Sequence, residues 1–188
     1  MVVVLGILGS PRPGGNTAIL LESFLEGARA VGAETVLLDA TGMLISGCKA
    51  CNDCQDDGIC VVDDDMRTIY DALQRADVLV LATPLYFSGM SSQLKAVIDR
   101  CQCLWQMVSK GNRPGTKHGY LLSVGAMKNA NFKNVSSEVR SFFIGIGITY
   151  RGEATVPGVE SEGDIRSHPE ELARAYRMGQ GSVKCDLT

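Results

Sequence analysis

The sequence contains no run of basic residues and no long apolar stretch. Its 18 Lys and Arg residues and 21 Asp and Glu residues are dispersed and give a formal net charge of −3. Nucleic acids and anionic lipids select a basic stripe, and a membrane-spanning helix needs roughly 20 consecutive apolar residues. We therefore expect no nucleic-acid partner and no membrane partner.

Two further patterns are missing from the start of the chain. The apolar residues 2–8 have no basic leader and no small-residue cleavage site, so they do not resemble a signal peptide, and we expect a cytoplasmic protein. The turn after them has neither the Gly-x-Gly-x-x-Gly fingerprint nor a Walker loop. Adenine dinucleotides and nucleoside triphosphates are therefore disfavoured as resident ligands.

Cysteine, in contrast, is abundant and clustered. The chain has seven cysteines, an odd number, and four of them lie between residues 48 and 60. In a reducing compartment such clustering points to metal binding or redox chemistry before structural disulfides.

Short apolar runs alternate with amphipathic helical patterns along the whole chain. The expected strands cover 2–8, 35–38, 78–82, 120–124 and 148–156, and the expected helices 18–28, 66–76, 94–105, 135–144 and 172–178. Right-handed crossovers between such units give a parallel sheet covered on both faces. We predict a single α/β domain over residues 1–188, a three-layer flavodoxin-like fold with strand order 2-1-3-4-5 and a cysteine-rich insertion at about 47–62. Ligands of such sheets bind at the carboxyl ends of the strands, at the switch point between strands one and three.

The turn at residues 9–17 combines glycines with side-chain donors. It joins the first strand to the first helix, so its backbone N–H groups and the helix dipole converge on one anion position. A flexible turn would need only the glycines and prolines, whereas hydroxyl, amide and guanidinium groups suit a phosphate monoester. The expected phosphate-binding residues are Ser10, Arg12, Gly15, Asn16 and Thr17.

Two later loops leave strands three and four at the same edge. Two aromatics in a short glycine-containing loop are unusual unless they cover something flat, such as a flavin ring, although core packing could explain one of them. The segment at the end of strand four is expected to form a third wall of the flavin site. The expected flavin-binding residues here are Pro84, Leu85, Tyr86, Phe87, Ser88, Gly89, Ser123 and Gly125. Together with the phosphate turn, these loops predict FMN as a cofactor.

Cys48, Cys51, Cys54 and Cys60 have the spacing of a cluster ligand set. Three thiolates in one tight run with a fourth returning nearby satisfy a 4Fe-4S cluster. Zinc also accepts four cysteines but usually from two distant pairs, and a loop that binds no metal is a further alternative. Cys101, Cys103 and Cys185 lie outside the run and are expected to be ordinary thiols. The acidic residues 63–65 are expected to form the solvated first turn of a helix.

These motifs resemble those of a known superfamily. Residues 9–12 with 15–17, 84–86 with 93–95, and Asp99 with Arg100 look like the NADPH-dependent FMN reductase superfamily over residues 1 to about 150. Within it, the cysteine run and the residues 63–66 resemble the iron–sulfur flavoproteins of anaerobic archaea and bacteria. The resemblance implies a homo-oligomer, dimer or tetramer, in which the cluster faces a neighbouring subunit's flavin, with ferredoxin as the donor.

We therefore expect an FMN-dependent oxidoreductase that relays single electrons between ferredoxin and FMN through a 4Fe-4S cluster. No side chain is expected to act as a catalytic acid or base, because the flavin performs the redox chemistry. One alternative is an NAD(P)H-dependent FMN or quinone reductase without a cluster. Another, of a different class, is a non-catalytic redox-sensing or zinc-binding module.

Overall fold

The structure is a computed structural model that describes residues 1–112 and 117–184. The strands are β1 (Val3–Leu8), β2 (Glu34–Asp39), β3 (Val78–Pro84), β4 (His118–Gly125) and β5 (Thr149–Pro157). The α-helices are α1 (Asn16–Arg29), α2 (Met66–Arg75), α3 (Ser92–Arg100), α4 (Gln102–Ser109), α5 (Lys133–Gly145) and α6 (Pro169–Lys184). Two short 3₁₀ helices, η1 (Asp53–Gln55) and η2 (Asp164–Ser167), lie in connections.

All five strands form one parallel sheet. Their order is β2-β1-β3-β4-β5, which confirms the predicted flavodoxin-like topology. The register pairs Leu8 with Ala82 and Pro84 with Val124, so β1, β3 and β4 end side by side. The loops that follow these strands therefore meet at one edge.

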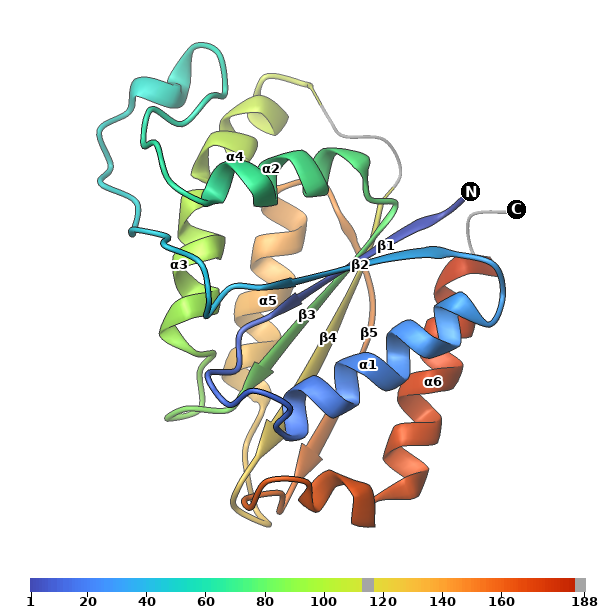
Figure 1. The fold of residues 1–188 in the computed structure, drawn as a ribbon. Coiled ribbons are helices and arrows are strands. Elements are labelled where there is room, and N and C mark those ends of the chain that lie inside the picture. The colour runs from blue at the N-terminus through green and yellow to red at the C-terminus, as the bar shows by residue number, and fades with distance from the viewer. Residues whose placement is uncertain (113–116, 185–188) are drawn as a thin grey trace.

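Successive residues of the central strands contribute to two hydrophobic cores, one on each face of the sheet. Leu5 and Ile7 of β1 face the core built with α2, α3 and α5, whereas Val4 and Leu8 face the core built with α1 and α6. Successive strand residues point to opposite faces, so strands buried on both sides read as continuous apolar runs. Figure 1 shows α1 and α6 packed together on one face of the sheet.

Close backbone packing joins α1 to α6. A Cβ atom added to Gly27 would lie 2.0 Å from the carbonyl oxygen of Tyr176, and one added to Gly179 would lie 1.9 Å from that of Phe24. Only glycine permits this approach, since any side chain would collide with backbone. The pair fixes how α6 crosses α1.

The predicted single helix over 94–105 is wrong, because the chain forms two helices that meet at Cys101. Cys101 is the C-terminal cap of α3 and leaves helical geometry at φ −73° and ψ 8°. The carbonyl of Arg100 accepts a 2.7 Å hydrogen bond from the hydroxyl of Tyr70. The carbonyl of Arg100 therefore has a hydrogen-bond partner at the break.

The connection between β2 and α2 carries the cysteines and has little regular structure. In the part of the chain that the structure describes, this connection contains only η1. Figure 1 shows the segment around residues 50–60, drawn in cyan, beside α4 rather than beside the loop that precedes α1. None of the described helices is both long and apolar enough to span a membrane.

Candidate functional site

A crevice of about 140 Å³ opens where the central strands end. It takes side chains from the turn before α1, from the loop after β3, from the end of β4 and from the loop after β5. The lining residues are Ser10, Arg12, Asn16, Thr17, Pro84, Leu85, Tyr86, Val124, Ala126, Val159 and Glu160. Seven of the residues expected to bind FMN thus share one crevice, at the edge where parallel sheets bind ligands.

The turn before α1 presents polar groups and a close backbone. Ser10 and Thr17 are buried, and the Nη1 atom of Arg12 donates a 2.8 Å hydrogen bond to the carbonyl of Glu160. Gly15 is the N-terminal cap of α1, and a Cβ there would lie 2.9 Å from the Cβ of Arg12. The geometry suits a phosphate, because unpaired N–H groups at a helix start attract anions.

Asn16 has a different environment from that expected of a free phosphate donor. Its Nδ2 atom donates to the carbonyl of Ser161 at 2.8 Å, and its Oδ1 atom accepts from the backbone N–H of Ile165 at 3.1 Å. The amide therefore ties the start of α1 to the loop after β5. One amide N–H remains for a ligand, since this group carries two.

The loop after β3 ends in a tight hairpin. Tyr86 and Gly89 exchange two 2.9 Å backbone hydrogen bonds, and the residues between them, Phe87 and Ser88, adopt positive φ values of 49° and 67°. Phe87 is fully exposed, and neither Phe87, Ser88 nor Gly89 lines the crevice. Of the two aromatics expected over a flavin ring, only Tyr86 lines the crevice. A bulky residue at positive φ is strained, and such strain collects at functional sites.

The wall after β4 also differs in detail from the expectation. Ser123 is completely buried, does not line the crevice, and its Oγ atom has no hydrogen-bond partner among the described residues. Val124 and Ala126 line the crevice instead. Gly125 lies between them, where a Cβ would be 2.9 Å from that of Ala130.

The fourth wall of the crevice was not predicted from the sequence. Val159 and Glu160 follow β5, which ends at the same edge as the other strands. Gly158 before them adopts a φ of 76°, so the chain turns back toward the crevice at this point. The rule that ligands bind beyond the carboxyl ends of parallel strands could have identified this loop as well.

The four clustered cysteines share a second, smaller pocket of about 30 Å³. Cys48, Cys51, Cys54 and Cys60 all line it, and no residue lines both this pocket and the crevice. Burial raises the pKa of Cys54, and the neighbouring thiols of Cys60, Cys51 and Cys48 raise it further. Within residues 1–112 and 117–184, however, no three Cys, His, Asp or Glu side chains are arranged to hold a metal ion. The thiols are gathered but not in ligand geometry.

The loop that carries these cysteines, residues 47–61, is closed at its base by acidic side chains. Asp64 accepts hydrogen bonds from the backbone N–H and the hydroxyl of Ser46, and Asp65 accepts one from the N–H of Leu44. Asp64 also forms a 2.6 Å salt bridge with Arg100, whose side chain is buried. The acidic triplet was expected to be solvated. Asp63, with 82% of its side chain exposed, and Asp65 are exposed, whereas Asp64 is partly buried.

Helix α3 separates the crevice from the cysteine pocket. At its start, the hydroxyl of Ser91 caps the N–H of Leu94 at 3.3 Å, while the N–H of Ser91 donates to the hydroxyl of Thr83 at 3.0 Å. Arg100, at its end, lines the cysteine pocket. Nine helical residues span about 14 Å. The two sites are thus held one short helix apart.

Of the remaining thiols, Cys103 lines the cysteine pocket together with the four clustered cysteines, whereas Cys101 does not. Cys101 and Cys103 are buried, and burial raises the pKa of each. Buried neutral thiols of this kind are poor ligands. Cys185 lies outside the described residues.

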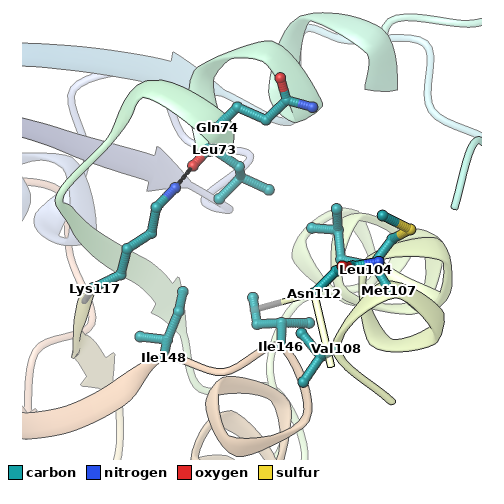
Figure 2. A pocket seen from close by; sticks show the side chains of 9 residues that line it. All are labelled: Leu73, Gln74, Leu104, Met107, Val108, Asn112, Lys117, Ile146 and Ile148. Carbon is teal, nitrogen blue, oxygen red and sulfur yellow. Dashed lines mark hydrogen bonds between the residues drawn. The ribbon is translucent and has the colours of Figure 1, made fainter. Parts of the chain in front are cut away.

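A larger cavity of about 350 Å³ lies at the opposite ends of the strands. Figure 2 shows its largely apolar lining and the hydrogen bond that Nζ of Lys117 donates to the carbonyl of Leu73. The lining residues are Leu73, Gln74, Leu104, Met107, Val108, Asn112, Lys117, Ile146 and Ile148. Lys117 precedes β4, so this cavity does not belong to the crevice.

Comparison with known proteins assigns the family. The model of the NADPH-dependent FMN reductase family matches residues 2–160. An iron-sulfur flavoprotein of Methanocaldococcus jannaschii is 34% identical over 141 residues, 75% of this chain and 71% of that protein. Another, of Archaeoglobus fulgidus, is 30% identical over 191 residues, 94% of this chain and 96% of that protein.

Solved structures share the fold. An NAD(P)H:quinone oxidoreductase from Methanothermobacter marburgensis superposes with a TM-score of 0.74 at 19% identity, over 95% of this chain and 98% of the other. The family match and the crevice at the ends of β1, β3 and β4 agree. The chain belongs to the NADPH-dependent FMN reductase family and is a flavin-dependent oxidoreductase.

Proposed function

We propose that this protein relays single electrons between a ferredoxin and FMN through a 4Fe-4S cluster held by Cys48, Cys51, Cys54 and Cys60. The observation that supports the proposal most directly is that all four thiols line one pocket, apart from the crevice that would hold FMN. The iron-sulfur flavoproteins found by comparison are relatives over most of the chain, and their name states that they contain an iron-sulfur group and a flavin.

The crevice residues would bind and orient the flavin. Ser10, Thr17 and the backbone at the start of α1 would hold the phosphate, with Arg12 adding a charge-assisted hydrogen bond. Tyr86 and Leu85 would pack against the ring. Bound FMN supplies the redox chemistry, so the protein need provide only binding, orientation and electrostatic tuning.

The cysteine loop would have to rearrange to take up a cluster. Its pocket of about 30 Å³ is close to the size that holds a single water molecule, and the raised pKa of Cys54 marks a protonated thiol. Ligation requires deprotonated sulfur, so loading would release protons and reshape the loop. The contacts that such a movement would change include the hydrogen bonds that Nζ of Lys110 donates to the carbonyls of Gln55 and Asp56 and the packing of Gly58 against Met107.

The separation of the two sites favours a homo-oligomer, a dimer or a tetramer, in which the cysteine loop of one subunit meets the flavin crevice of another. Phe87, which follows the crevice residue Tyr86, and Trp105 on α4 are exposed aromatics, which are enriched at interfaces. Analytical ultracentrifugation of the loaded protein tests this part of the proposal. A strictly monomeric protein would contradict it.

Anaerobic purification followed by iron, sulfide, zinc and flavin analysis tests the main proposal. We expect a yellow-brown protein that contains iron and sulfide in equal amounts together with FMN. Cys54→Ser and Cys60→Ser should lose the iron and sulfide but retain FMN, because the two pockets share no residue. Cys101→Ser is the matched control and should retain both, since Cys101 is buried away from the loop.

The alternative functions give different results in the same experiment. A reductase with a purely structural cysteine loop would contain FMN without iron and would oxidise NAD(P)H rapidly. A redox-sensing or zinc-binding module would contain zinc, or no metal, and no flavin. Either result would reject the relay.

A further inference from the structure

Arg100 is the most deeply buried charged side chain in the described structure. Only 1% of the residue is exposed, although arginine is almost never fully buried without partners. Removing a guanidinium from water costs several kcal/mol unless hydrogen bonds and an opposite charge offset it. The position of Arg100 therefore requires an explanation in the groups around it.

Those groups all belong to the base of the cysteine loop. The Nη1 atom of Arg100 donates to Oδ2 of Asp64 at 2.6 Å and to the carbonyl of Ser46 at 3.0 Å, and Nη2 donates to the carbonyl of Val62 at 3.3 Å. Ser46 and Val62 flank the loop on either side. The side chain of Arg100, at the end of α3, thus holds the two ends of the cysteine loop together.

Asp64 completes the arrangement. Its Oδ2 atom also accepts the hydroxyl and the N–H of Ser46, at 2.9 and 3.0 Å. Burial alone would raise the pKa of Asp64, but the hydrogen bonds from Arg100 and Ser46 outweigh burial and hold that pKa well below the usual range. Asp64 is therefore charged at any physiological pH, and the pair is formally neutral.

One donor of Arg100 is unused. Its Nε atom is buried and has no hydrogen-bond partner among the described residues, while Arg100 lines the same pocket as the four cysteines. Burial lowers the pKa of Arg100, but Asp64 and, after it, Cys60 beside the guanidinium outweigh burial and raise that pKa. A buried N–H without a partner is rare and costly, so a group that accepts it is expected.

We propose that Arg100 is the positioning residue of the cysteine pocket: it clamps the base of the cysteine loop and reserves its Nε–H for a sulfur of Cys60 or of the cluster. The part of this proposal that concerns cluster sulfur rests on the function proposed above. Hydrogen bonds to cluster sulfurs and the net charge of the surroundings both set the potential of a cluster. Arg100 would therefore favour the reduced, more negative state, while Asp64 would oppose it.

The opposed charges of Arg100 and Asp64 give a test that a merely structural role would not pass. Arg100→Met removes the positive charge and the N–H donor, so the cluster should become harder to reduce. Asp64→Asn keeps the guanidinium but removes the opposing charge, so the cluster should become easier to reduce. Damage to the loop alone would move both variants in the same direction.

The experiment is a redox titration of the anaerobically purified holoprotein, followed by electron paramagnetic resonance. At a fixed potential we expect Arg100→Met to lower the ratio of reduced to oxidised cluster about tenfold, a 59 mV shift for one electron, and Asp64→Asn to raise it. Arg100→Lys, which keeps the charge, should fall between wild type and Arg100→Met and stands in if the latter does not fold. Arg75→Met, an exposed arginine at the end of α2, is the control and should have no effect. Shifts of the same sign, or none beyond the control, would overturn the proposal.

A second measurement uses the apoprotein and does not depend on a cluster. Hydrogen exchange of the Ser46 amide, which donates to Asp64, should accelerate at least tenfold in Arg100→Met and Arg100→Lys but not in Arg75→Met. If the wild type contains no iron or sulfide, the proposed function fails, whereas this measurement still decides whether Arg100 clamps the loop. Unchanged exchange at Ser46 would then overturn the clamp itself.

Discussion

The Oδ2 atom of Asp64 accepts a 2.6 Å hydrogen bond from Nη1 of Arg100, across 36 residues of sequence. The bond joins the residue two positions before α2 to the last residue of α3. Arg100 also donates to the carbonyl of Ser46, at the base of the cysteine loop. Because it is buried, the pair should contribute to stability in a way that depends on pH.

The free energy of unfolding should fall at acidic pH because of this pair. The pKa of Asp64 is lowered in the folded protein, so its stabilising effect is present above the unfolded pKa of about 4 and is lost as the pH falls below that value. Urea denaturation of the apoprotein at pH 6 and at pH 3 measures the loss. Asp64→Asn should lower stability by about 3 kcal/mol at pH 6 and should flatten the dependence on pH. Asp63→Asn, at an exposed ion pair, should change stability by less than about 0.5 kcal/mol; an equal loss in both variants would contradict the assignment.

Glycine at the contact between α1 and α6 should be irreplaceable. Gly27→Ala and Gly179→Ala each place a Cβ within 2.0 Å of a backbone carbonyl oxygen and should destabilise by about 3 kcal/mol. Gly181→Ala, in the same helix with open space around it, should instead stabilise by roughly 1 kcal/mol, since alanine favours helices. Chemical denaturation of the three variants decides the matter, and a similar effect at Gly179 and Gly181 would refute the packing described.

Strain in the hairpin after β3 should be removable. Ser88 adopts a φ of 67°, which costs roughly 1 kcal/mol or more for a residue with a side chain. Ser88→Gly should therefore raise the free energy of unfolding by about 1 kcal/mol, whereas Ser88→Ala should not. FMN affinity should not change, because Ser88 does not line the crevice. A gain with alanine as well would mean that the backbone is not strained.

The charge of Arg12 should matter for the phosphate and not for the ring. Arg12→Ala should weaken FMN binding about tenfold, the worth of a charge-assisted hydrogen bond near 1.5 kcal/mol. Riboflavin, which lacks the phosphate, should bind the variant and the wild type equally. Fluorescence titration with both flavins measures the two affinities, with Arg75→Ala as the control. Equal weakening for FMN and riboflavin would place Arg12 elsewhere in the site.

The order of strands and helices, and the edge of the sheet at which the crevice opens, could be predicted from the sequence. The apolar run 2–8 and its successors are buried on both faces, so their pattern is unambiguous, and right-handed crossovers then leave few topologies. Ser10, Thr17 and Tyr86 could be assigned to one crevice because parallel strands end together. Local spacing likewise grouped the four cysteines that share a pocket.

The hydrogen-bond partners of side chains that are far apart in the sequence depend on the tertiary structure and could not be predicted. Asn16 binds the loop at 161–165, Phe87 points to solvent, and the helix expected over 94–105 breaks where Tyr70 takes the carbonyl of Arg100. Neither Arg100 nor Asp64 differs in sequence from an ordinary surface charge, since burial depends on how α3 and the cysteine loop pack. Periodicity reports which face of an element is apolar, but it cannot report which distant polar atom fills a gap in the packing.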